Sequence, residues 1–225
     1  FNKRWHSYHF KGEKMTSVTS WVAQYKQPFD KDKWSNYVAE RDGKPVADVL
    51  AEWDAKRDRS CDVGHHVHTH IENCLNDARD LDHFPMRPES NEYAGYISAF
   101  YGWLAKYGTH LRRPTLEPER MVCWPDAKLA GTIDLACELN SVFDSNKSLF
   151  GLIDWKTNEK ITQTNAYERM KPPFEDLPDC NWSHYCLQLN LYRIILMKAY
   201  DLDVRFMRLI HLRPDATHEV YTVPL

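Results

Sequence analysis

The sequence predicts a mixed α/β domain built around one central sheet, because a helical half is followed by a half that is rich in strands. Apolar residues recur at helical spacing within residues 1–115, whereas β-branched, aromatic and apolar residues fill short segments of residues 116–225. The chain of 225 residues is 43% hydrophobic, enough for one sizeable core, and no linker divides it. We therefore expect a single domain over residues 1–225.

Three amphipathic helices are predicted in the first half. Their apolar positions are Val46, Val49, Leu50 and Trp53, then Val63, Val67, Ile71 and Cys74, then Tyr93, Ile97, Phe100 and Leu104. Within each set, the spacing places the residues on one face of a helix. Because acidic, basic and proline-rich stretches separate the sets, we expect separate helices.

The second half predicts three strands, a helix and two further strands. The strands are residues 120–124, 129–139 and 149–156, the helix is 183–200, and the last strands are 204–212 and 219–223. The polar stretch 140–147 contains Asp-Ser-Asn, which favours a turn. The first three strands are therefore expected to form a meander.

The overall composition leaves several classes of function open. A formal net charge of -3 gives no global attraction to nucleic acid, so binding would require local basic groups and metal ions. The sequence has no run of about 18 apolar residues and no signal peptide, so neither a membrane span nor a membrane partner is expected. Six scattered cysteines without a CxxC pair indicate reduced thiols.

Two aspartates, Asp134 and Asp154, lie inside predicted strands. A buried carboxylate is costly alone, but two that face each other across adjacent strands form a hard-oxygen site for Mg²⁺ or Mn²⁺. Because side chains alternate along a strand, Asp154 and Lys156 share a face, with Trp155 buried on the other. The lysine could then stabilise a phosphate oxygen or help to activate a water in phosphodiester hydrolysis. Taken singly, these residues could equally be a strand-end aspartate and a surface ion pair.

A histidine-rich segment precedes the strands and contains His65, His66, His68 and His70. At helical spacing, His68 and Glu72 lie together beside the apolar face and offer an imidazole and a carboxylate to one point. The four histidines also invite a zinc interpretation. However, zinc needs several converging ligands and the other histidines fan around the helix, so a dedicated zinc site is the weaker alternative.

Gln188 and Tyr192 are one helical turn apart in the predicted helix 183–200. Simple amphipathicity would explain this pair. In a functional interpretation, Gln188 holds a phosphate or the catalytic lysine, and Tyr192 stacks on or hydrogen-bonds to a nucleic-acid strand.

Four motifs occur in a fixed order within about residues 60–195. They are Gly64-x-x-Val67-His68-x-x-Ile71-Glu72, Gly131-Thr-Ile-Asp134, Ile153-Asp154-Trp155-Lys156-Thr157 and Gln188-x-x-x-Tyr192. This set resembles the RecB-like branch of the PD-(D/E)XK nuclease superfamily, in particular the mitochondrial genome maintenance exonucleases and related phage exonucleases. The chain departs from that pattern at His65, where relatives usually carry a small hydroxyl residue.

The resemblance implies a restriction-endonuclease-like core, with a central mixed sheet flanked by helices in residues 116–225 and a mainly helical elaboration in residues 1–115. It implies that His68, Asp134, Asp154 and the Trp155 backbone carbonyl are metal ligands, that Lys156 is the catalytic lysine, and that Gln188 and Tyr192 support it. Glu72 and Glu119 are candidate auxiliary carboxylates, although Glu119 could equally be a solvated charge at the end of a strand. One or two Mg²⁺ or Mn²⁺ ions are the expected cofactors. No iron-sulfur cluster is expected, because relatives that carry one have a C-terminal group of cysteines that this chain lacks.

Aromatic and basic residues after residue 156 predict contacts with nucleic acid. The candidates are Tyr167, Arg169, Lys171, Trp182 and Tyr185. Exposed rings stack on the bases of single strands while basic groups follow the phosphates, although such rings can also belong to the core. Residues 158–182 are polar, contain proline and are long for a connection, so they could form a flap over a threaded strand. Such a flap favours an exonuclease, and together with the resemblance it leads us to expect a DNA exonuclease that acts on single-stranded DNA or DNA ends in replication, recombination or repair.

Other functions stay open on the sequence alone. An RNA endonuclease would use the same residues, and a non-cleaving nucleic-acid-binding module or a histidine-rich zinc protein are further alternatives. Replication or recombination proteins are candidate partners. The resemblance favours the cytoplasm of a bacterial or phage-infected host cell over the mitochondrial matrix, for which the sequence carries no leader.

Overall fold

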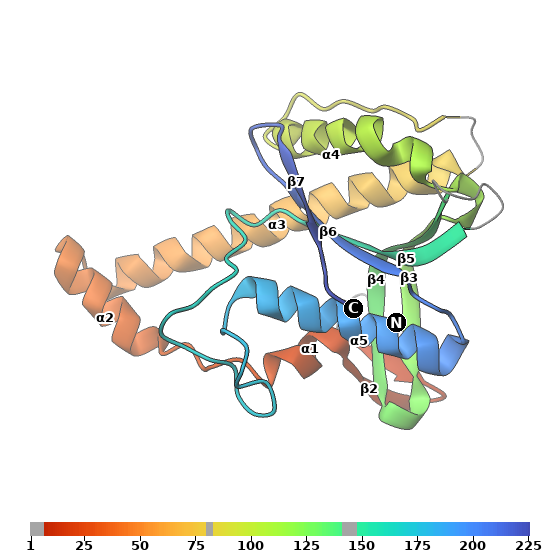
Figure 1. Cartoon of the computed structure of the whole chain (residues 1–225). Coiled ribbons are helices and arrows are strands. Elements are labelled where there is room, and N and C mark those ends of the chain that lie inside the picture. The colour runs from red at the N-terminus through yellow and green to blue at the C-terminus, as the bar shows by residue number, and fades with distance from the viewer. Residues whose placement is uncertain (1–6, 80–82, 141–147) are drawn as a thin grey trace.

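A computed structural model describes residues 7–79, 83–140 and 148–225, with one seven-stranded mixed sheet flanked by helices (Figure 1). The strands are β1 Tyr8–Phe10, β2 Glu13–Ser17, β3 Glu117–Trp124, β4 Leu129–Asn140, β5 Ser148–Lys156, β6 Phe206–Leu212 and β7 His218–Thr222. The helices are α1 Val18–Ala23, α2 Lys31–Asp42, α3 Val46–Ala78, α4 Ala94–Tyr107 and α5 Asn181–Tyr200, with short 3-10 turns η1 Gly108–His110, η2 Arg113–Thr115 and η3 Pro125–Ala127. The mixed α/β class expected from the sequence is confirmed.

The strand order is β1-β2-β4-β5-β6-β7, and β3 pairs with the other edge of β4. Strands β3, β4 and β5 pair antiparallel, which confirms the predicted meander. Helix α5 then crosses over and returns the chain to β6, which pairs parallel with β5. The turn predicted at 140–147 falls almost wholly on residues 141–147, which lie outside the described residues.

Four N-terminal elements were absent from the expectations: β1, β2, α1 and α2. Strand β1 has three residues and α1 has six, too few to show a period. For the two helices, the sequence carries only local capping residues. The Ser17 side chain accepts a hydrogen bond from the Ser20 backbone amide at the start of α1, and Asp30 accepts one from Lys33 at the start of α2.

The expectation of separate helices before and after residues 54–62 is wrong, because α3 is one helix of 33 residues. Residues 54–62 contain neither proline nor glycine, so no residue interrupts the backbone ladder. Their polar side chains lie in solvent, where Arg57 pairs with Asp54 at 2.8 Å, one helical turn away. A polar stretch here marks an exposed helix, and Figure 1 shows this part of α3 extending beyond the sheet, with α2 near its end.

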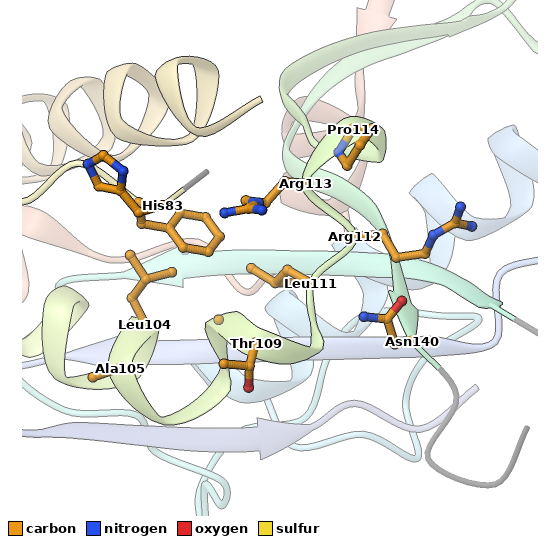
Figure 2. A pocket seen from close by; sticks show the side chains of 11 residues that line it. His83, Leu104, Ala105, Thr109, Leu111, Arg112, Arg113, Pro114 and Asn140 are labelled. Atoms are coloured by element: carbon orange, nitrogen blue, oxygen red, sulfur yellow. The ribbon is translucent and has the colours of Figure 1, made fainter. Parts of the chain in front are cut away.

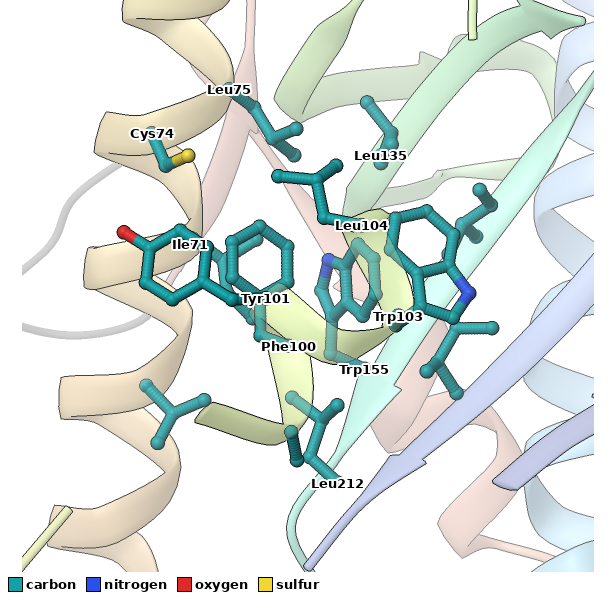
Figure 3. Close-up of a cluster of buried hydrophobic side chains, with 14 of the residues drawn as sticks. Ile71, Cys74, Leu75, Phe100, Tyr101, Trp103, Leu104, Leu135, Trp155 and Leu212 are labelled. Atoms are coloured by element: carbon teal, nitrogen blue, oxygen red, sulfur yellow. The ribbon is translucent and has the colours of Figure 1, made fainter. Parts of the chain in front are cut away.

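Apolar side chains form a core on each face of the sheet. Helices α3 and α4 cover one face and α1 and α5 cover the other. In the first core, the Trp155 ring packs edge-on against Trp103 at 4.9 Å and Phe100 at 5.5 Å between centroids (Figure 3). The prediction that Trp155 is buried on the opposite side of the strand from Asp154 is therefore confirmed.

Two further features concern the helices and the cysteines. Within residues 7–79, 83–140 and 148–225, no helix combines the length and apolarity needed to cross a bilayer. All six cysteines are free thiols in the structure.

Candidate metal centre

Strands β4 and β5 separate where the predicted carboxylates lie. They pair as far as Leu135 and Ile153, and on the same edge of β4 strand β2 pairs with Leu129 and Ala130. The stretch of β4 from 131 to 134 therefore borders an opening in the sheet. Across this fork, the Trp155 backbone amide donates a hydrogen bond to Asp134 Oδ2 at 2.9 Å, so an aspartate side chain replaces the strand partner.

Glu119 of β3 lies opposite Asp134, between the registered pairs Pro118–Leu135 and Arg120–Ile133. Its φ is 49°, in the left-handed region that costs a non-glycine residue on the order of 1 kcal/mol or more. The alternation of side chains along β4 is also interrupted here, since Ile133 packs in the core against α5 and Leu135 in the core against α3 and α4. A regular strand would place both side chains on one face.

This irregular point lies beneath His68 of α3. His68 Nδ1 is 3.5 Å from Asp134 Oδ2 and 4.0 Å from Glu119 Oε1, and the three ligand atoms all lie within 4.8 Å of one another. His68 Nε2 is 3.1 Å from the Trp155 backbone oxygen. An imidazole and two carboxylates that converge in this way could hold a metal ion, and within the described ranges no other such group occurs.

On the adjacent strand, β5, the side chains of Asp154 and Lys156 point toward α5. The Asp154 carboxylate is 2% exposed, Lys156 Nζ is 2.5 Å from its Oδ2, and Gln188 Nε2 donates to its Oδ1 at 3.4 Å. Of the two carboxylates expected as metal ligands, only Asp134 belongs to the group around His68, whereas Asp154 forms an ion pair with Lys156.

The two charges of this pair shift each other's titration. Burial raises the pKa of Asp154 to about 6; the Lys156 ammonium opposes this rise and Asp134 adds to it. For Lys156, burial lowers the pKa, but the carboxylates of Asp154 and Asp134 outweigh burial and leave it above its usual value. Lys156 is therefore a permanent cation at neutral pH, suited to stabilising negative charge and unsuited to accepting a proton.

Helix α5 supports the fork from the second face of the sheet. Tyr192 is 3% exposed, and a Cβ atom on Gly131 would lie 2.6 Å from its Cε1, so the ring needs a glycine opposite it. The expectation that Tyr192 contacts a nucleic-acid strand disagrees with this burial. Its role in the structure is to pack against β4, next to the turn of helix from which Gln188 reaches Asp154.

Only one of the expected nucleic-acid contacts lies at this centre. Lys156 Nζ is 4.9 Å from the Tyr185 ring centroid, and the Tyr185 hydroxyl donates to Asn158 Oδ1 at 2.7 Å. Trp182 packs on the Tyr221 ring at 5.5 Å, and is half-buried.

The remaining expected contacts lie in the connection between β5 and α5. Tyr167 is 96% exposed, Arg169 donates to the Asp176 backbone oxygen at 3.2 Å, and the Lys171 side chain is exposed. The Lys171 backbone amide donates to the Tyr25 backbone oxygen at 2.8 Å, which holds the connection against the residues that follow α1. All three residues are exposed, and none of these contacts involves a residue of the fork.

The other histidines of α3 turn away from the fork, as expected. His66 and His70 both contact Glu89, at 2.9 and 3.0 Å, and His65 is exposed. Glu72, the second expected auxiliary carboxylate, is half-buried and does not belong to the converging group. The converging auxiliary carboxylate is Glu119, whose position depends on strand register and backbone conformation rather than on any local motif.

A hollow of about 650 Å³ near the end of α4 contains none of the expected site residues (Figure 2). Phe84, Leu104 and Leu111 line it together with Arg112 and Arg113. Arg112 pairs with Glu138, so part of its positive charge is already neutralised. The chemistry at the fork and the volume of this hollow thus point to different places, and the converging ligands identify the candidate site.

No family model matches this chain, and no curated protein resembles it closely enough to count as a match. The function must therefore be inferred from the residues and the geometry at the fork.

Proposed function

We propose that this chain is a metal-dependent DNA nuclease that hydrolyses phosphodiester bonds, acting as an exonuclease on single-stranded DNA or DNA ends. The observation that carries the proposal is the convergence of His68, Glu119 and Asp134 within 4.8 Å, one strand away from the Lys156 ammonium. A divalent cation site beside a fixed cation is the arrangement that phosphodiester hydrolysis needs. We further propose that the forked sheet is a restriction-endonuclease-like core.

The donor set fits a hard divalent ion. Asp134 and Glu119 supply carboxylate oxygens and His68 Nδ1 supplies one nitrogen, a combination that suits Mg²⁺ or Mn²⁺. The Trp155 backbone oxygen, which the sequence also predicted as a ligand, lies instead at the opposite ring nitrogen, His68 Nε2, where it would accept a hydrogen bond that orients the imidazole. When bound, one or two such ions would supply polarisation of the phosphate and a more acidic water. Asp134 and Glu119 would then be relieved of their mutual repulsion.

The chain's own residues then have distinct tasks. Lys156 donates to a non-bridging oxygen of the scissile phosphate and stabilises the charge that grows there during attack. Asp154 orients Lys156, and Gln188 holds Asp154. The Tyr185 ring covers the ammonium and restricts its direction, which favours a single position for the phosphate.

The direct test is cleavage of end-labelled single-stranded DNA, duplex DNA and matched RNA in Mg²⁺, Mn²⁺ or EDTA. Wild-type protein is compared with Lys156→Ala and with Lys198→Ala, an exposed lysine near the end of α5 that serves as the control. A metal-dependent ladder on single-stranded DNA that disappears only in Lys156→Ala would support the proposal and give the polarity. Preferred cleavage of RNA would change the substrate, and binding without cleavage in every metal would replace the nuclease with a binding module.

A further inference from the structure

We propose that a polar cleft next to the candidate metal centre binds the sugar-phosphate backbone of a single strand, and that Glu159 weakens this binding. The proposal rests on the proposed function, since it takes nucleic acid to be the substrate. It adds a subsite beyond the scissile phosphate and a residue that limits affinity.

The cleft lies between α3 and the segment that follows β5, and has a volume of about 350 Å³. Its lining includes Lys56 and Ser60 of α3 and Thr157, Asn158, Glu159 and Lys160 of the facing segment. Thr157 follows Lys156 directly in the chain, and the Tyr185 ring that lies 4.9 Å from Lys156 Nζ carries the hydroxyl that donates to Asn158 of the lining. A strand whose scissile phosphate contacts Lys156 would therefore have its neighbouring phosphates at the mouth of this cleft.

The chemistry of the lining selects the backbone of a strand rather than its bases. Every residue that lines the cleft is polar, and none is aromatic. Hydroxyl, amide and ammonium groups are the usual partners of phosphate and sugar oxygens, whereas base recognition without sequence preference depends on stacking rings. We expect affinity from this cleft to be the same for different base sequences.

The facing segment is held in place before any ligand binds. The Asn158 backbone oxygen accepts a hydrogen bond from His211 Nε2 at 2.6 Å, and its side chain accepts one from Tyr185 at 2.7 Å. Two residues further on, the Lys160 oxygen accepts one from the Asn181 side chain at 2.9 Å. A wall fixed in this way loses little freedom when a strand binds.

The charges in the cleft are unequal. Lys56 Nζ lies 2.8 Å from Glu159 Oε2, whereas Lys160 has no ion-pair partner in the part of the chain that the structure describes. Both members of the Lys56–Glu159 pair are exposed, by 73% and 77% of their side chains. A phosphate entering the cleft would meet Lys160 directly but would compete with Glu159 for Lys56.

The test measures binding of fluorescent single-stranded oligonucleotides of two base sequences at several salt concentrations, with Ca²⁺ in place of Mg²⁺ and a gel to confirm that the DNA stays intact. Lys160→Gln should raise Kd by roughly three- to tenfold on both sequences and reduce the slope of log Kd against log salt by about 0.7, the value for one phosphate contact on a single strand. Glu159→Gln should lower Kd by roughly two- to fivefold. Lys198→Gln, which carries the same charge change near the far end of α5, should alter neither quantity.

Three results would overturn the subsite: equal effects of Lys160→Gln and Lys198→Gln, a loss that depends on base sequence, or weaker binding by Glu159→Gln. Absence of any strand binding would do the same. Hydrolysis of bis(p-nitrophenyl) phosphate by the wild-type chain reports the metal centre separately, because this diester is too small to extend into the cleft. Binding that follows the expected pattern without any diester hydrolysis would leave the subsite standing and remove the nuclease.

Discussion

Helix α3 presents histidines to carboxylates at two different places. On one side, His68 lies 3.5 Å from Asp134 and 4.0 Å from Glu119, beside the backbone oxygen of Trp155. We call this set the fork cluster. On another side, His66 and His70 share one carboxylate, Glu89, and His70 Nε2 lies 2.9 Å from the Tyr101 hydroxyl. This second set, with Tyr93 stacked on His66 at 4.0 Å, is the Glu89 cluster.

The difference between the clusters lies in how charge is balanced. In the Glu89 cluster, burial opposes ionisation, but hydrogen bonds from Asn91, His66 and His70 hold the pKa of Glu89 below its usual value. One carboxylate meets two histidines, so the group is satisfied from within. In the fork cluster, two carboxylates meet one histidine, which leaves an excess of negative charge that a cation can offset. The same residue types therefore make a structural network in one place and a candidate ion site in the other.

The largest expected contrast is in cleavage. Asp134→Ala and Lys156→Ala should each lower kcat on end-labelled single-stranded DNA by about 10²–10³-fold or more, because they remove ion binding and charge stabilisation. His66→Ala and His70→Ala should keep nearly full activity. Circular dichroism should show that all four variants are folded. Activity retained in both fork variants would sink the nuclease assignment.

The rise in Tm caused by a metal ion should depend on the fork cluster and not on the Glu89 cluster. At about 100 times its Kd, Mn²⁺ should stabilise the wild-type chain by about 2.7 kcal/mol, which corresponds to a rise in Tm of roughly 5–10 °C. Asp134→Asn and Glu119→Gln should lose that rise in a melting experiment, while His70→Asn should retain it. If the rise in Tm with Mn²⁺ disappeared in His70→Asn but persisted in Glu119→Gln, the ion would bind at the Glu89 cluster, and the candidate metal centre would be rejected.

The Glu89 cluster should matter for folding instead. Glu89→Gln should lower the free energy of unfolding by about 1 kcal/mol in urea titrations at neutral pH, because the histidines lose a charged hydrogen-bond partner. Since the pKa of Glu89 is depressed in the folded state, this contribution is complete above its unfolded value and is lost as pH falls through its folded value. The difference between wild type and variant should therefore shrink progressively as pH falls below about 4.5. A gap that widens in acid would contradict this interpretation.

The smallest expected effect concerns His65, which points to neither cluster and is exposed. His65→Ser should change the free energy of unfolding by less than about 0.5 kcal/mol and leave kcat within about twofold. The measurement is a urea titration together with the cleavage assay. A larger change in KM would indicate that the strand passes over this turn of α3.

The sequence predicted the parts of the site that depend on local alternation. Asp154, Trp155 and Lys156 lie on the expected faces of β5 because a strand repeats every two residues. The position of Glu119 depended on the register of β3 against β4 and on a left-handed backbone, neither of which has a local pattern.

Errors arose where distant residues decide the environment. Tyr192 is buried because Gly131, far away in the chain, leaves room for its ring. The polar residues 54–62 resemble a break, yet α2 and a series of surface ion pairs accompany a continuous helix there. The order of helical and strand-like patterns therefore predicted the class of fold, and contacts between remote segments determined which side chains reach the fork.

Because α3 is one continuous helix, the number of residues between two of its side chains fixes both the distance and the angle between them. Ser60 faces the polar cleft, His68 faces the fork and His70 faces Glu89, all along one unbroken rod. Inserting or deleting a single residue between Ser60 and His68 would rotate the two ends by about 100° relative to each other. Such a change would leave each end of the helix folded, but Ser60 and His68 could no longer face the cleft and the fork at the same time. We therefore expect the part of α3 between Ser60 and His68 to tolerate substitutions far better than insertions or deletions.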